Sequence, residues 1–129
     1  MKEIGIYIHI PYCKKKCHYC DFISFSGKEE TQNKYIEAIL KEISECTYTG
    51  FNIGTIYIGG GTPSIIDPAY ITKIIAKIRE KFIVSQNAEI TIEVNPGTVD
   101  REKLLEYKKA GINRLSIGLQ STDNAILKQ

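Results

Sequence analysis

Residues 4–10 read IGIYIHI, and residues 13–20 read CKKKCHYC. In the first stretch isoleucine occupies every second position, which is the period of a β-strand with one buried face. Tyr7 and His9 then share the opposite face of that strand. Pro11 closes the run, so the second stretch lies on the loop that leaves the carboxyl end of the expected strand. The rest of the chain can be interpreted as a scaffold for this strand and its loop.

The loop contains three cysteines, Cys13, Cys17 and Cys20, in the pattern C-x3-C-x2-C. Three thiolates suit a metal centre better than a disulfide, because pairing two of them leaves the third unpaired. Structural zinc would need a fourth protein ligand, His9 or His18. A [4Fe–4S] cluster usually takes four cysteines, so this motif would leave one iron open for an exogenous ligand. The cluster is the better fit, and zinc and a disulfide are the alternatives.

Composition places the 129 residues in one ordinary globular domain, with 43% hydrophobic and 25% charged residues. The net charge of +2 gives no reason to expect a nucleic-acid partner. The sequence shows no transmembrane segment and no signal peptide, so we expect a cytoplasmic protein. Reducing conditions there favour metal or redox roles for clustered cysteines. Cys46 lies apart in a helical pattern and is expected to be a small buried residue.

Apolar strand-like runs alternate with amphipathic helical stretches along the whole chain. The order β-α-β-α-β-α-β predicts an α/β fold with parallel strands and right-handed crossovers, which needs cover on both faces of the sheet or closure into a barrel. The expected strands span residues 4–10, 54–58, 89–93 and 114–118. The first expected helix spans about residues 31–46. The second begins at Asp67-Pro68 and has the apolar stripe Ile71, Ile74, Ile75, Ile78 and Phe82, and the third runs from Asp100 through Leu104, Leu105 and Tyr107 to Gly111.

Unusual polar or glycine-rich segments follow each expected strand, where the active sites of parallel α/β folds gather. They are the cysteine loop, GGGTP at 59–63, EVNP at 93–96 and the segment containing Gln120. The glycine run matches neither common nucleotide fingerprint, but it permits close backbone approach to a ligand. Glu93 and Gln120 are either ordinary rim residues or hydrogen-bonding partners of that ligand.

Several motifs together resemble a known family. They are the three-cysteine motif with Tyr19 before its last cysteine, YIHIPYC at 7–13, GGGTPS at 59–64, EVNP at 93–96 and SIGLQS at 116–121. The combination resembles the radical S-adenosylmethionine superfamily. Within it, the likeness is to the group of oxygen-independent coproporphyrinogen III oxidases and HemW-type heme chaperones. It runs over essentially the whole chain.

The resemblance implies a partial (β/α)6 TIM-like barrel that holds a [4Fe–4S] cluster and S-adenosylmethionine. Cys13, Cys17 and Cys20 match the cluster ligands. Gly60, Gly61 and Thr62 match the loop that holds the methionine end, and Tyr7, Tyr19, Glu93 and Gln120 match positions that contact the rest of the cofactor. An electron from the cluster would then cleave the sulfonium of S-adenosylmethionine.

Cys20 is followed by Asp21 and Phe22 where the oxidases typically carry a further cysteine. This resembles the heme-chaperone branch, with heme or a porphyrin as cargo and a protein electron donor as partner. The oxidase, which converts coproporphyrinogen III to protoporphyrinogen IX, is the alternative. A non-catalytic zinc-binding α/β domain is a more remote alternative. Family members are much longer, so we expect residues 1–129 to be the N-terminal portion of a radical S-adenosylmethionine core domain, truncated before the remaining strands and the C-terminal domain, and inactive alone.

Overall fold

The structure is a computed structural model that describes residues 2–12, 29–48 and 50–117. Its sheet has four strands, all parallel, in the spatial order β1-β2-β3-β4. The strands are β1 (Lys2–Ile10), β2 (Phe51–Gly60), β3 (Ile83–Val94) and β4 (Arg114–Ile117), and the helices are α1 (Glu29–Glu45), α2 (Pro68–Lys81) and α3 (Arg101–Ala110), with short 3-10 helices η2 (Pro63–Ile65) and η3 (Pro96–Thr98) after β2 and β3. The expected order of elements is confirmed.

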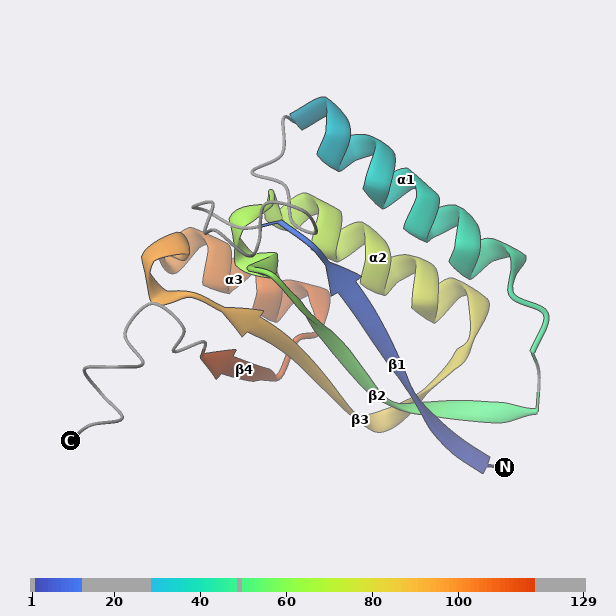
Figure 1. Cartoon of the computed structure of the whole chain (residues 1–129). Helices are drawn as coiled ribbons and strands as arrows, with labels where there is room; N and C mark the ends of the chain where they lie inside the picture. Colours follow the sequence, from blue (N-terminus) through green and yellow to red (C-terminus); the bar gives the residue numbers. More distant parts are fainter. Residues whose placement is uncertain (1, 13–28, 49, 118–129) are drawn as a thin grey trace, which may run out of the picture.

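All three helices lie on the same side of the sheet (Figure 1). This follows from the strand order, because each right-handed crossover adds the next strand along the same edge and so returns its helix over the same face. The opposite face carries no helix within the described residues. Side chains that alternate along the strands are therefore divided between a helix-packed face and an open face.

Isoleucine forms most of the core between the sheet and the helices. Ile8, Ile58 and Ile92 are neighbours across β1, β2 and β3 and are 7%, 0% and 0% exposed. Four members of the predicted stripe of α2 are buried against the same core, and they are Ile71, Ile74, Ile75 and Ile78. Burying each such side chain contributes about 2 kcal/mol. The strand alternation that the sequence predicts therefore supplies the main stabilisation of the fold.

Helix boundaries follow the expected capping residues. The Asp67 carboxylate accepts a hydrogen bond from the Ala69 amide at 2.9 Å at the start of α2. Asp100 accepts one from the Lys103 amide at 2.8 Å at the start of α3. Gly111 ends α3 with φ of 105°, a left-handed conformation that favours glycine. Of the three apolar residues expected on α3, only Tyr107 is buried, whereas Leu104 and Leu105 are 36% and 48% exposed.

β2 and β3 are longer than the sequence predicts, and α1 begins two residues earlier than expected. The additional lengths pair with each other, since Asn52 and Ile53 of β2 lie beside Ile83 and Val84 of β3. A register shift after Ile53 interrupts this ladder. Irregular pairing and the polar residues at 85–87 hide the strand period from a sequence reading.

Two residues lie outside the helices to which the sequence assigned them. Phe82 caps the end of α2, and its ring lies 5.8 Å from that of Phe51. It is partly buried against the core rather than part of the α2 stripe. Cys46 follows α1 and is a half-buried free thiol, so it is less buried than the sequence predicts.

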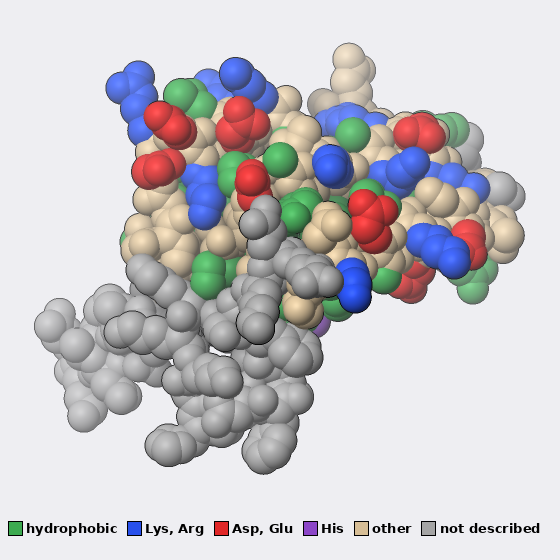
Figure 2. Space-filling model, turned by 90° about the horizontal axis from the view of Figure 1, so that it is seen from above, with side chains coloured by type: hydrophobic (Ala, Val, Ile, Leu, Met, Phe, Trp, Pro, Cys, Tyr) green, Lys and Arg blue, Asp and Glu red, His purple; other side chains and the backbone are tan. Residues whose placement is uncertain are grey.

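Charged side chains of both signs are interspersed over the face seen from above in Figure 2. The chain has a net charge of +2. Such mixing leaves no large field of one sign on the described part of this face. Among the described residues, no helix combines the length and the apolar character that crossing a membrane requires.

Candidate functional site

The glycine-rich loop after β2 is joined to the end of β1 by backbone hydrogen bonds. The Gly61 amide donates to the Ile10 carbonyl at 2.9 Å, and the Thr62 amide donates to the Tyr12 carbonyl at 2.6 Å. Tyr12 is 1% exposed and is the residue directly before Cys13 in the sequence. The chain therefore enters the cysteine motif from a point that the glycine-rich loop fixes.

Gly60 is required where β2 turns into this loop. Its φ of 120° is a backbone conformation that other residues rarely adopt. A Cβ atom at this position would lie 2.5 Å from the carbonyl oxygen of Ile10 and 2.9 Å from its amide nitrogen. Only glycine therefore lets β2 approach the end of β1 this closely.

Glu93, near the end of β3, points its carboxylate across β2. Its Oε1 accepts a hydrogen bond from the Gly60 amide at 3.0 Å. Its Oε2 accepts one from the Tyr57 hydroxyl at 2.8 Å. Gly59 leaves room for this carboxylate, because a Cβ there would lie 2.9 Å from Oε1. Both carboxylate oxygens are thus held on the open face, at the carboxyl end of the sheet.

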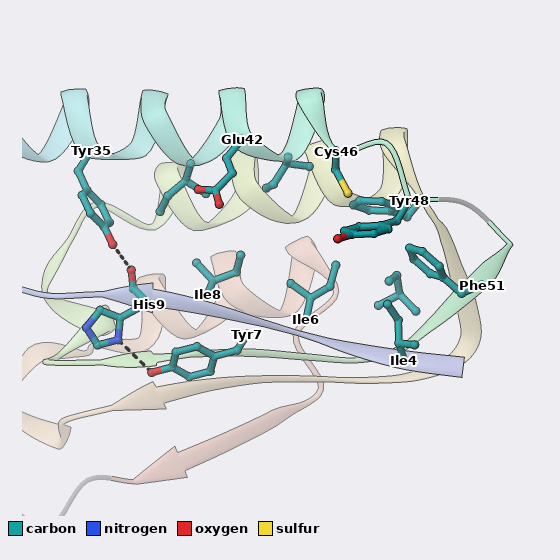
Figure 3. Close-up of a pocket in the computed structure, with 14 residues that line it drawn as sticks. Ile4, Ile6, Tyr7, Ile8, His9, Tyr35, Glu42, Cys46, Tyr48 and Phe51 are labelled. Carbon is teal, nitrogen blue, oxygen red and sulfur yellow. Dashed lines mark hydrogen bonds between the residues drawn. The ribbon is translucent and has the colours of Figure 1, made fainter. Parts of the chain in front are cut away.

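Aromatic side chains extend this arrangement toward β1. The Tyr7 and Tyr57 rings are stacked, with centroids 5.9 Å apart and an angle of 19° between their planes. Tyr7 Oη lies 3.1 Å from His9 Nδ1, and the Tyr35 hydroxyl of α1 donates to the His9 carbonyl at 2.6 Å (Figure 3). Figure 3 also shows that Tyr7 and His9 lie on the side of β1 away from Ile6 and Ile8. Hydrogen bonds on either side of the Tyr7–Tyr57 ring stack therefore connect α1 to Glu93.

The pKa of Tyr7 is raised above its ordinary value. Burial is the largest cause, followed by the negative charge of Glu93 and by the neighbouring hydroxyls of Tyr57 and Tyr35. Tyr7 is nevertheless 56% exposed, so solvent weakens these effects. Its hydroxyl stays protonated at neutral pH and is available as a hydrogen-bond donor.

Polar side chains also join the loop after β2 to the loop after β3. The buried Ser64 hydroxyl accepts a hydrogen bond from the Asn95 amide at 3.1 Å and lies against the Thr98 hydroxyl. Lys103 of α3 donates from Nζ to the carbonyls of Ser64 and Thr98, the latter at 3.0 Å. Burial lowers the pKa of Lys103, and Asp100 and Asp67 oppose that shift. Lys103 of α3 therefore bridges the loop after β2 and the loop after β3.

A small polar cleft of about 40 Å³ opens between these loops and β4. It is lined by Gly61, Thr62, Pro63, Glu93, Val94, Asn95 and Ser116. Two larger cavities lie elsewhere in the described structure. One of about 400 Å³ lies between β1 and α1 (Figure 3), and one of about 600 Å³ lies beside α3 and β4. The predicted polar residues converge on the small cleft, so it is the candidate binding site although the other two cavities are larger.

The structure brings together those predicted site residues that it describes. Gly60, Gly61, Thr62 and Glu93 meet at one end of the sheet, and Tyr7 reaches them through its stack on Tyr57. The other predicted site residues lie outside the described residues, and they are Cys13, Cys17, Tyr19, Cys20 and Gln120. Within the described part of the chain, no group of three metal-ligating side chains occurs.

The sequence did not predict three residues of this region, which are Tyr57, Ser64 and Lys103. Tyr57 carried a usable signal, since it alternates with Ile56 and Ile58 and therefore lies on the open face with Glu93. Ser64 belongs to the GGGTPS motif, although its contacts could not be read from it, and Lys103 carried no signal because its contacts join segments distant in sequence.

Comparison with known proteins assigns the chain to a family. The sequence profile described as the Radical SAM superfamily matches residues 7–129, which is nearly the whole chain. The chain belongs to the radical SAM superfamily. Membership of the radical SAM superfamily implies, in general terms, a [4Fe–4S] cluster and S-adenosylmethionine.

Several curated relatives are named "Heme chaperone HemW". The chain is 44% identical over 132 aligned residues to the "Heme chaperone HemW" of Buchnera aphidicola subsp. Acyrthosiphon pisum, covering 100% of this chain and 35% of that protein. It is 40% identical to the "Heme chaperone HemW" of Escherichia coli, again covering 100% of this chain and 35% of the relative. The chain therefore spans about a third of the length of these relatives.

A solved structure confirms the fold. The chain superposes on the coproporphyrinogen III oxidase HemN from Escherichia coli, titled a radical SAM enzyme, with a TM-score of 0.79 and 28% sequence identity. The match covers 99% of this chain and 31% of that one. The four parallel strands and their helices thus correspond to part of a TIM-barrel-like radical SAM fold, as the sequence predicts.

Proposed function

We propose that Cys13, Cys17 and Cys20 bind three irons of a [4Fe–4S] cluster at the carboxyl end of the sheet. The observation that carries this proposal is the pair of hydrogen bonds from Gly61 and Thr62 to Ile10 and Tyr12. These bonds fix the chain directly before Cys13 beside the glycine-rich loop. Three thiolates are a suitable donor set for such a cluster, and they leave one iron free for a ligand.

S-adenosylmethionine is the proposed ligand of that iron. Gly60, Gly61 and Thr62 would lie against its methionine end. Their amides already donate to Glu93, Ile10 and Tyr12, so the loop would offer backbone carbonyls and the Thr62 hydroxyl. Glu93, with Tyr7, Tyr19 and Gln120, would contact the remainder of the cofactor. The chemistry of the cleft supports this role, because a hydroxyl and an oriented carboxylate line it, although its volume of about 40 Å³ admits only one end of such a ligand. When bound and reduced, the cluster and S-adenosylmethionine together supply radical chemistry, and the protein supplies orientation and exclusion of water.

The whole protein is proposed to be a cytoplasmic heme chaperone of the HemW type, with residues 1–129 as the N-terminal portion of its radical SAM core domain. The names of the relatives at 44% and 40% identity support this function. They also support heme as the cargo. An electron-donor protein would be needed to reduce the cluster. Coproporphyrinogen III oxidation is the second candidate, favoured by the fold shared with HemN.

Iron analysis tests the metal site. After anaerobic reconstitution, the protein should be brown and hold roughly four irons per chain. Cys13→Ala should lose most of this iron. Cys46→Ala is the matched control and should keep all of it, because Cys46 lies beyond α1 in the cavity between α1 and β1. A colourless protein with one equivalent of zinc would instead support the zinc-binding domain.

Assays on the full-length protein separate the two heme-pathway functions. A chaperone should bind heme stoichiometrically and leave the propionates of coproporphyrinogen III intact. An oxidase should release carbon dioxide from coproporphyrinogen III when supplied with S-adenosylmethionine and a reductant. Decarboxylation without heme binding would reject the chaperone in favour of the oxidase.

A further inference from the structure

The Glu93 carboxylate is oriented by three features of β2 before any ligand is bound. The Gly60 amide holds Oε1 at 3.0 Å, and the Tyr57 hydroxyl holds Oε2 at 2.8 Å. Gly59 supplies the space between them, since a Cβ there would lie 2.9 Å from both Oε1 and the Tyr57 ring. A half-buried glutamate on a strand end is thereby restricted to one position.

Tyr57 is itself held in place. Its ring stacks on Tyr7 of the neighbouring strand, and the two residues are register partners across β1 and β2. The Tyr7 hydroxyl in turn contacts His9. Tyr57 therefore presents its hydroxyl to Glu93 from a supported ring rather than from a freely rotating one.

The two hydrogen bonds leave capacity on the carboxylate. An ionised carboxylate has about four acceptor positions, two on each oxygen. Tyr57 and Gly60 each use one, on different oxygens. One position on each oxygen remains, so two adjacent donors of a ligand, such as neighbouring hydroxyl groups, can be bound together. The energetic benefit depends on the carboxylate already being oriented.

We propose that Tyr57 is a positioning residue for S-adenosylmethionine, which acts by holding the Glu93 carboxylate in the orientation that the cofactor binds. This inference rests on the proposed function, because Glu93 must contact the cofactor. It goes beyond that function because it attributes part of the affinity for S-adenosylmethionine to Tyr57, which does not need to touch the ligand. Gly59 is part of the same device, since its missing side chain admits the carboxylate.

Tyr57→Phe tests the hydroxyl while keeping the ring stack. The full-length, cluster-loaded protein is titrated with S-adenosylmethionine by calorimetry, without oxygen and without a reductant, so that the ligand is not consumed. The dissociation constant should rise about tenfold, the scale of one hydrogen bond to a charged group. Iron content should not change. Tyr107→Phe is the matched control, because its hydroxyl has no partner among the described residues and lies away from the cleft.

A double-mutant cycle separates positioning through Glu93 from a general structural effect. Glu93→Ala alone should weaken binding by more than tenfold. Adding Tyr57→Phe to Glu93→Ala should change the dissociation constant by less than about twofold, because the group it orients is gone. An equal loss in both backgrounds would overturn the inference, as would a Tyr57→Phe protein with unchanged affinity.

Gly59→Ala provides a second route to the same carboxylate. The added methyl would meet the side chains of Glu93 and Tyr57 rather than backbone, so the strands can keep their pairing while the carboxylate is displaced. S-adenosylmethionine should bind about tenfold more weakly. Unchanged binding would contradict the inference. If unsubstituted, cluster-loaded protein bound no S-adenosylmethionine at all, the proposed function itself would fail, which is a distinct result.

Discussion

Gly60 combines two constraints that are separable in this chain. It has a φ of 120°, and a Cβ there would contact the backbone of Ile10 at 2.5 Å. Gly50 has only the first constraint, with a φ of 85° and nothing within 4 Å of an added Cβ. The pair distinguishes backbone strain from a clash between two strands.

Gly60→Ala should therefore destabilise the protein more than Gly50→Ala. Left-handed backbone strain costs about 1 kcal/mol or more for a residue with a side chain. Gly60→Ala must in addition move the end of β1, so we expect a total loss of at least about 3 kcal/mol. Urea unfolding of the two variants measures the difference. Equal losses would show that the contact with Ile10 is easily relieved.

Tyr107 is a buried residue whose hydroxyl has no hydrogen-bond partner among the described residues. An unpartnered buried polar group costs about 1–3 kcal/mol. Burial raises the pKa of Tyr107 above the value of about 10 that it has in an unfolded chain. Between these two pKa values the folded state binds more protons than the unfolded state, so stability falls as pH rises through this range.

Tyr107→Phe should therefore leave the protein as stable as before, or more stable by up to about 1 kcal/mol at pH 7. Above pH 10 the gain should increase, because the variant no longer has this phenol to ionise on unfolding. Urea midpoints measured from pH 7 to 11 test both statements. A variant that is less stable at every pH would show that the hydroxyl has a favourable contact.

At the scale of elements, Lys103 connects three of them. It lies on α3 and donates to carbonyls of the loop after β2 and of the loop after β3. Ser64 and Asn95 link the same loops directly. The lysine is only half-buried, so it can carry its charge there while its hydrogen bonds are satisfied.

Lys103→Met should cost about 1–3 kcal/mol, because two loop carbonyls lose a charged donor. Lys109→Met changes the same charge on the exposed side of the same helix and should cost less than about 0.5 kcal/mol. Thermal unfolding of both variants provides the comparison. If the two losses were equal, the effect of Lys103 would be one of net charge rather than of its contacts.

The sequence predicts elements well where one physical signal dominates. The alternating isoleucines of β1, the buried stripe of α2, and the caps Asp67, Asp100 and Gly111 are found as expected. The early part of β3 is not predicted, because its pairing with β2 is irregular and its residues are polar. The site is predicted in outline from the loops that follow the strands. The contacts of Tyr57 and Lys103 depend on tertiary packing, which local sequence does not encode.

At the scale of the whole molecule, apolar surface remains on the last strand and helix. Leu115 and Ile117 of β4 are 43% and 58% exposed, and Leu104 and Leu105 of α3 are 36% and 48% exposed. β4 is also an edge strand within the described sheet. An exposed apolar edge favours pairing with another chain.

A polypeptide of these 129 residues alone should therefore self-associate at micromolar concentration. Replacing Leu115 and Ile117 together by lysine should reduce the association, because charge on an edge strand opposes pairing. Ile83→Lys on β3 is the control and should have little effect, because Ile83 is as exposed as Ile117 but does not lie on β4. Sedimentation velocity measures both variants. A monomer at about 100 μM, within the micromolar-to-millimolar range in which unpaired edges associate, would contradict this expectation.

The bonds from Gly61 and Thr62 to Ile10 and Tyr12 have a thermodynamic consequence. They couple the position of the glycine-rich loop to that of residues 10–12, which directly precede the cysteine motif. Under the proposed function, one loop receives the small molecule and the other receives the iron. Occupation of either would then lower the free energy of occupying the other, and by reciprocity the two increments are equal. The apoprotein would fill both sites cooperatively, and loss of metal would release the small molecule as well.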